Sequence, residues 1–131
     1  MPRFLVAIKS NSRSEAGIQP SEQLQAQMSA YNVELERAGV RLSAEGLWPS
    51  SRGARVTFRD GAVKVVDGPF AEAKEAIGGF WILQCKSLDE CIEWVKRVPV
   101  DALPGAAGES EIIILQVIDW DEFVAQQEKG Q

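Results

Sequence analysis

The chain contains short stretches in which apolar and polar residues alternate, and longer stretches in which apolar residues recur every three or four positions. The stretch Arg3–Lys9 alternates, which predicts a first strand. Ser21 is in the position of an N-cap, and Gly39 is in the position of a helix end. Between them, successive apolar residues are separated by four, three, four and three positions. This spacing predicts a helix whose buried face consists of Leu24, Met28, Tyr31, Leu35 and Ala38.

Turn and cap residues divide the rest of the chain. Asp60-Gly61 lies between two β-rich runs and is a strong hairpin signal. Ser87 is placed to cap a second helix, and Glu90 is placed to complete a capping box. The other predicted elements are strands at residues 40–47, 54–59, 62–66, 78–84 and 111–118 and helices at residues 87–97 and 119–127. Polar or Pro/Gly-rich loops are predicted at residues 11–20, 48–53 and 98–108.

The order of these elements indicates the fold class. If the hairpin is set aside, the order is β-α-β-β-α-β, which is typical of a ferredoxin-like split βαβ domain of the α+β class. Such a domain has helices on one sheet face only, and the chain has many aromatic residues for its size, among them Trp48, Phe58, Trp81 and Trp120. We therefore expect a homodimer whose open faces pack together. Burial of these aromatic residues within one subunit is the alternative.

Length and charge restrict the class of protein. A chain of 131 residues, 45% hydrophobic and 25% charged, is expected to form one soluble globular domain over residues 1–131. The net charge of −5 disfavours direct binding of nucleic acid. No apolar run reaches the roughly 20 residues of a membrane span. The N-terminus predicts a strand rather than a signal peptide, so we expect a cytoplasmic location and no membrane partner.

The absence of one residue type limits the chemistry. Without histidine, Ser-His-Asp and Cys-His catalysis and imidazole metal ligands are excluded. Cys85 and Cys91 have five residues between them, which fits neither a CxxC redox pair nor a zinc site. They are interpreted as reduced, packed thiols, with a catalytic or redox thiol as the alternative. No carboxylate run resembles a calcium loop, so we expect neither a metal ion nor a cofactor.

One stretch resembles a known family. DGPFAEAKEAIGGFWIL, residues 67–83, closely resembles the signature of DGPF-domain proteins, which are part of the YCII-related family. The segments AEGLWP, VTFRDGAVKVVDGPF and LDECIEWVKRVP resemble further features of that family. The resemblance extends to about Val117, so residues 119–131 are expected to be a C-terminal extension of a single YCII-related (DGPF) domain. It implies a ferredoxin-like fold with an inserted hairpin, forming a dimeric α+β barrel.

The resemblance implies less about activity. The wider family includes members with a His-Asp pair, a dehydrochlorinase that acts on an aromatic ring is similar, and muconolactone isomerase-like enzymes share the dimeric barrel. This chain has no histidine, and residues 112–116 read IIILQ where many relatives have Glu-x-Arg-Pro. DGPF-type proteins often occur beside extracytoplasmic-function sigma factors, which indicates a regulatory setting and association with a sigma factor.

Two interpretations of the DGPF stretch remain open. In the structural one, Asp67 and Pro69 form a rigid corner, Gly68 supplies an unusual φ, and Phe70 anchors the corner in the core. In the functional one, Asp67 lies in a pocket at the barrel mouth together with two charged residues from other positions. These are Glu45 and Lys74.

The functional interpretation names specific residues. The candidate catalytic residues are Asp67, Lys74 and Glu45, and the expected ligand-binding residues are Asp67, Phe70, Lys74, Trp81 and Arg52. Burial would raise the pKa of a carboxylate in such a pocket, and the lysine would offset that shift. The carboxylate would then abstract a proton beside a carbonyl, and the lysine would stabilise the enolate. Arg52 would hold an anionic ligand, with a solvated side chain as the alternative.

Three functions follow. The favoured one is a YCII/DGPF-type homodimer of undefined activity that binds a small molecule in the barrel or acts in regulation. The second is a cofactor-free lyase or isomerase acting on a small cyclic or unsaturated acid. The third is an interaction protein that associates with a sigma factor. The sequence leaves open whether the protein is an enzyme.

Overall fold

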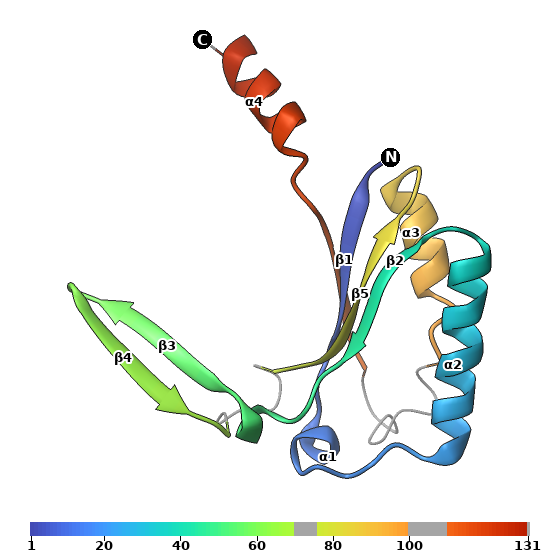
Figure 1. Cartoon of the computed structure of the whole chain (residues 1–131), viewed down its shortest axis with the longest axis vertical. Coiled ribbons are helices and arrows are strands. Elements are labelled where there is room, and N and C mark those ends of the chain that lie inside the picture. The colour runs from blue at the N-terminus through green and yellow to red at the C-terminus, as the bar shows by residue number, and fades with distance from the viewer. Residues whose placement is uncertain (70–75, 100–109, 131) are drawn as a thin grey trace.

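The computed structural model describes residues 1–69, 76–99 and 110–130. It is a mixed α and β structure with one four-stranded sheet and a separate two-stranded hairpin (Figure 1). The strands are β1 (Arg3–Lys9), β2 (Arg41–Gly46), β3 (Ala54–Arg59), β4 (Ala62–Asp67), β5 (Ile77–Gln84) and β6 (Ile112–Gln116). The helices are α1 (Ser12–Glu15), α2 (Glu22–Arg37), the 3₁₀ turn η1 (Ser50–Arg52), α3 (Leu88–Val95) and α4 (Trp120–Lys129).

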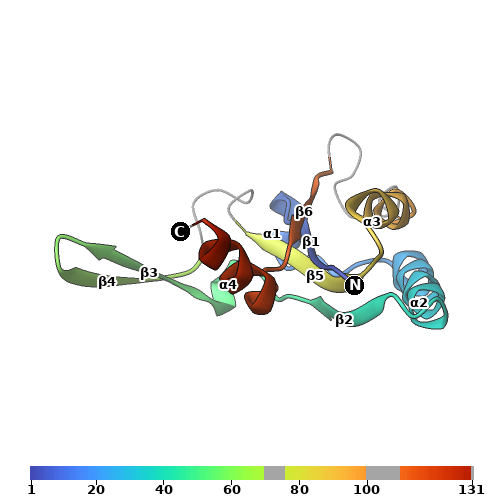
Figure 2. The same cartoon turned by 90° about the horizontal axis from the view of Figure 1, so that it is seen from above.

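The four-stranded sheet has the order β2-β5-β1-β6, and each neighbouring pair is antiparallel. Helices α2 and α3 lie on one side of this sheet, as both views show (Figures 1 and 2). The helix-covered face holds the core, because Val6 of β1 pairs with Trp81 of β5 and both side chains are buried. The core cluster consists of Phe4, Val6, Tyr31, Leu35, Val40, Trp81, Leu83, Cys85, Cys91 and Val98.

The opposite face of the sheet, which we call the open face, is apolar as well. Side chains alternate along a strand, so the neighbours of the buried residues point away from the helices. The strand register aligns Leu5 with Ile82 and with Leu115, and it aligns Ala7 with Phe80 and with Ile113. Leu115 is 59% exposed, and Phe80, Ile82 and Ile113 are half-buried. The described strands form an open sheet rather than a closed barrel, so the expected barrel is not present within one chain.

The predicted helix caps are present. The Ser21 hydroxyl accepts a hydrogen bond from the Leu24 N–H at 3.1 Å, and the Ser87 hydroxyl accepts one from the Glu90 N–H at 3.1 Å. The second half of the capping box differs slightly, because the Glu90 carboxylate accepts from the Lys86 N–H instead of the Ser87 N–H. The caps therefore begin α2 and α3 as the sequence predicts.

The predicted hairpin is also present, and it projects from the body of the molecule (Figure 1). Asp60 and Gly61 have φ values of 51° and 79°, which is the left-handed conformation that a tight hairpin turn requires. Every residue of β3 and β4 is exposed. The hairpin thus has strand pairing but no share in the core.

Two local predictions need correction. The segment predicted as a loop between Asn11 and Pro20 contains the short helix α1, which Asn11 caps by accepting a hydrogen bond from the Ser14 N–H at 2.9 Å. Gly68 is not among the residues with positive φ. Its role is close approach instead, since a Cβ at this position would lie 1.7 Å from the Ser50 carbonyl oxygen.

Candidate functional site

A cleft of about 1090 Å³ lies between the N-terminal half of α2 and one end of the sheet. Its walls come from four segments that are far apart in the sequence. They are the end of β1 with the loops and the part of α2 that follow, the end of β2 with the loop into η1, the start of β5, and residues 110–111 before β6. The cleft lies on the helix-covered side of the sheet, since residues of α2 line it. It is the described region that best fits a small-molecule site, because it is concave and combines aromatic and polar side chains.

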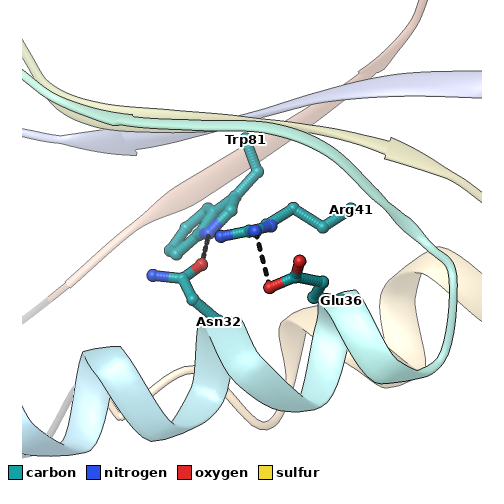
Figure 3. Close-up of polar contacts among 4 residues, drawn as sticks. All are labelled: Asn32, Glu36, Arg41 and Trp81. Carbon is teal, nitrogen blue, oxygen red and sulfur yellow. Dashed lines mark hydrogen bonds and ion pairs between the residues drawn. The ribbon is translucent and has the colours of Figure 1, made fainter.

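The floor of the cleft is built around Trp81. Its indole N–H donates a hydrogen bond to the Asn32 Oδ1 at 2.7 Å (Figure 3). Its ring also contacts Tyr31 edge to face at a centroid distance of 5.8 Å. Trp81 is 5% exposed, and its one donor is used by Asn32. Trp81 therefore has no hydrogen-bond donor left for a ligand and contributes to the cleft only the small part of its ring that lines it.

Beside this floor, Arg41 extends from β2 across the C-terminal half of α2 and forms an ion pair with Glu36 at 3.0 Å (Figure 3). Both side chains are partly exposed, so this pair adds little to stability. Its guanidinium is committed to Glu36 and is not available as a free cation for the cleft.

The outer wall is held by a link between two loops. The Glu15 carboxylate, at the end of α1, accepts hydrogen bonds from both the backbone N–H and the hydroxyl of Ser50 at the start of η1. Ser50 is 8% exposed. Hydrogen bonds to a charged acceptor are stronger than neutral ones, so this link fixes η1 against the loop after β1.

The mouth of the cleft holds a cation on an aromatic ring. The Arg52 guanidinium lies over the Trp48 ring at 4.1 Å from the centroid, a cation–π contact. On the other side of the cleft, Lys9 forms an ion pair with Glu111 at 3.1 Å. Of these two cations, Lys9 is neutralised by a carboxylate and Arg52 is held by a ring, so Arg52 keeps its charge available for an anion.

The predicted site residues are distributed over different places. Trp81, Arg52 and Glu45 all line the cleft. Glu45 pairs with Phe80 in the sheet, so its side chain points to the face opposite Trp81 and reaches the cleft only at the strand edge. Asp67 ends β4 opposite Ala54 and is not among the residues that line the cleft. Phe70 and Lys74 lie outside the described residues.

The buried titratable groups lie behind the floor, in the core. Burial raises the pKa of Cys85 to about 12, with the charge of Cys91 adding to the shift. Burial likewise raises the pKa of Cys91 and of Tyr31. Both thiols are free, which confirms the prediction of reduced, packed cysteines. None of the three groups supplies an anionic nucleophile at neutral pH.

The sequence interpretation missed Asn32 and the link between Glu15 and Ser50. The partners of each pair are separated by 49 and 35 residues. The residues around Asn32, Glu15 and Ser50 in the sequence show no pattern that predicts these contacts. The partners come together only when the helices pack on the sheet. Within the described residues, no group of three or more Cys, Asp or Glu side chains is placed to hold a metal ion.

Comparison with known proteins agrees with the sequence motif. The YCII-related domain matches residues 3–121, which is most of the chain. An uncharacterized protein of Rhizobium meliloti (strain 1021) is 33% identical over 75 residues. That match spans 57% of this chain and 60% of the relative. No helix in the described part of the chain is long and apolar enough to cross a membrane. On the extent of the domain match, the chain belongs to the YCII-related family.

Proposed function

We propose that the protein is a ferredoxin-like homodimer that binds a small organic acid in the cleft of each subunit. The strand order β2-β5-β1-β6 with helices on one face supports the ferredoxin-like assignment. The apolar open face supports the dimer, because two such faces packed together remove both from water. A pair of facing sheets would form the α+β barrel that one chain lacks.

The ligand class follows from the lining of the cleft. The floor provides part of the Trp81 ring and the mouth provides the Trp48 ring, so a ligand with a flat apolar body has surfaces to pack on. Arg52 provides a planar cation that can hold a carboxylate through two parallel hydrogen bonds. The single observation that carries the proposal is the Arg52 guanidinium, stacked on Trp48 at the mouth of an aromatic-lined cleft.

Calorimetric titration with matched probes tests the proposal. We expect benzoate and 2-naphthoate to bind more tightly than benzamide and 2-naphthamide, which have the same rings without the charge. Arg52→Gln should remove this preference, weakening acid binding about 10- to 100-fold, the range for one charge-assisted hydrogen bond. Arg59→Gln, at the hairpin tip and away from the cleft, is the matched control and should bind as wild type does.

Two results would contradict the proposal. One is equal affinity for an acid and its amide, which would show that the cleft does not recognise the charge. The other is unchanged acid binding in Arg52→Gln. Monomeric protein that still binds acids would contradict the homodimer alone, since each cleft is lined by residues of a single chain.

A further inference from the structure

The β3–β4 hairpin has one apolar and one cationic face. The register places Val56 opposite Val65 and Phe58 opposite Val63, so these four side chains share a face. They are strongly exposed: Val56 50%, Phe58 76%, Val63 62% and Val65 63%. The other face carries the polar and cationic residues Arg55, Thr57, Arg59 and Lys64 together with Ala62 and Val66. The hairpin therefore has the pattern of a half-buried ribbon, although its apolar face is open to water.

Helix α4 has the same pattern. Trp120, Phe123 and Val124 follow the i, i+3, i+4 spacing of one helical face, and they are 66%, 37% and 49% exposed. The Trp120 and Phe123 rings touch edge to face at 5.4 Å, which joins them into one apolar surface. No residue of α4 is buried. The first turn is acidic, with Asp121 and Glu122.

Both elements need a partner to be stable. A two-stranded hairpin is marginal in water without a third strand or a packed helix. A helix of 10 residues is also marginal unless its apolar face is packed. The two elements stand apart from each other within the chain, as the view in Figure 1 shows. Within the described residues neither apolar face is covered, which favours a partner from outside this subunit.

The direction in which they project identifies the partner. Figures 1 and 2 show the hairpin and α4 on the side of the sheet opposite α2 and α3. This is the side of the open face, so a second subunit packed on that face meets both elements. In a two-fold dimer, a contact between a hairpin and a helix occurs twice, because each subunit supplies one of each.

We propose that the two subunits exchange arms, with the apolar face of each β3–β4 hairpin packed on the apolar face of α4 from the other subunit. This inference rests on the homodimer proposed above and specifies the elements that hold it. Charge favours the pairing as well. The hairpin has three cationic residues and two acidic ones, whereas α4 has three acidic residues and one cationic one. The attraction should weaken with added salt.

A pair of substitutions on opposite hairpin faces tests the contact in the full-length protein. Phe58→Asp puts a charge on the apolar face, and Thr57→Asp puts the same charge on the neighbouring position of the other face. By sedimentation or light scattering, Phe58→Asp should weaken dimerisation by at least about tenfold, as for a central interface residue. Phe123→Asp in α4 should do the same. Thr57→Asp should stay within about twofold of wild type.

Cross-linking between two different chains tests the exchange itself. A Phe58→Cys chain is mixed with a Phe123→Cys chain, and a short bismaleimide is added. Arm exchange predicts a covalent heterodimer of twice the chain mass, well above the yield from Thr57→Cys mixed with Phe123→Cys. Cys85 and Cys91 are fully buried, and the single variants alone give the background.

The outcomes separate the two proposals. A dimer without the specific cross-link, or with normal affinity in Phe58→Asp, overturns arm exchange and leaves the homodimer standing. A protein that is monomeric at all accessible concentrations overturns both proposals. In that case the exposed apolar faces of the hairpin and α4 would bind a different protein, and a sigma factor is one candidate. A dimer that is lost in Phe58→Asp and Phe123→Asp and gives the cross-link supports the exchange.

Discussion

Alkaline pH should destabilise the protein through Cys85. In the folded state, burial raises the pKa of this thiol from 9.0 to about 12, and the charge of Cys91 adds to the shift. The unfolded chain binds fewer protons than the folded chain once the pH exceeds 9, because only the unfolded thiol ionises there. Stability from the protonated thiol is therefore fully present below pH 9 and is lost as the pH rises toward 12.

The size of the loss follows from the shift. One pKa unit corresponds to about 1.4 kcal/mol, so at about pH 10.5 the free energy of unfolding should fall by about 2 kcal/mol through Cys85 alone. This is a large part of the roughly 5–15 kcal/mol that a domain has in total. Cys91 and Tyr31 act in the same direction because burial raises the pKa of both.

Urea unfolding in the presence of a reductant measures this effect. Curves are recorded at about pH 7.5 and about pH 10.5 for wild type and for Cys85→Ala. The variant leaves a small cavity whose cost is the same at both pH values, so only the pH-dependent loss is compared. Wild type should lose about 2 kcal/mol more than the variant between the two conditions. Equal losses in the two proteins would refute the assignment of the alkaline transition to the Cys85 thiol.

Two further substitutions test the packing around the cleft. Gly68→Ala should lower the free energy of unfolding by about 1–3 kcal/mol, because the new methyl group would lie 1.7 Å from the Ser50 carbonyl oxygen. Gly53→Ala is the control: its methyl group would lie 3.5 Å from the same oxygen, so the loss in the same urea assay should be less than about 1 kcal/mol. Asn32→Leu should cost about 1–3 kcal/mol because it leaves the Trp81 indole N–H without its acceptor, whereas Glu36→Gln at the neighbouring exposed ion pair should cost about 0.5 kcal/mol or less.

Local signals account for the parts of the fold that the sequence predicted well. Asp60-Gly61 required positive φ at both positions, so the hairpin could be located from two residues. Ser21 and Ser87 marked helix starts because their hydroxyls satisfy N–H groups that the helix leaves unpaired. In each case the residues that determine the local structure lie within the short segment that adopts it. Leu88 shows the limit, since it is an apolar residue in the first turn of α3 and is nevertheless 50% exposed.

The cleft was not predictable in this way, because each of its defining contacts joins distant segments. Trp81 was expected to contact a ligand, and its place in the floor depends on Asn32, 49 residues away. Helix α1 lies where a polar loop was predicted. The Glu15 carboxylate at its end contacts Ser50, which follows the edge strand β2 in the chain, so this contact depends on the position of β2 in the sheet. Sequence patterns identify which residues are apolar, but they do not indicate which polar groups meet across the fold.

The DGPF motif connects the two proposals through Gly68. Its backbone N–H donates a hydrogen bond to the Gly53 carbonyl at 3.0 Å, and its missing side chain lets the base of the hairpin lie against the Ser50 carbonyl. Gly53 directly follows Arg52, the cation at the mouth of the cleft. The hairpin base and the arginine that we propose as the anion contact are thus attached to the same short turn. A partner subunit that holds the hairpin would therefore also restrict the backbone beside Arg52. Restricting a binding segment before a ligand arrives removes part of the ordering cost of binding. If both proposals hold, dimerisation and ligand binding would strengthen each other through the turn that joins Gly53 to Gly68.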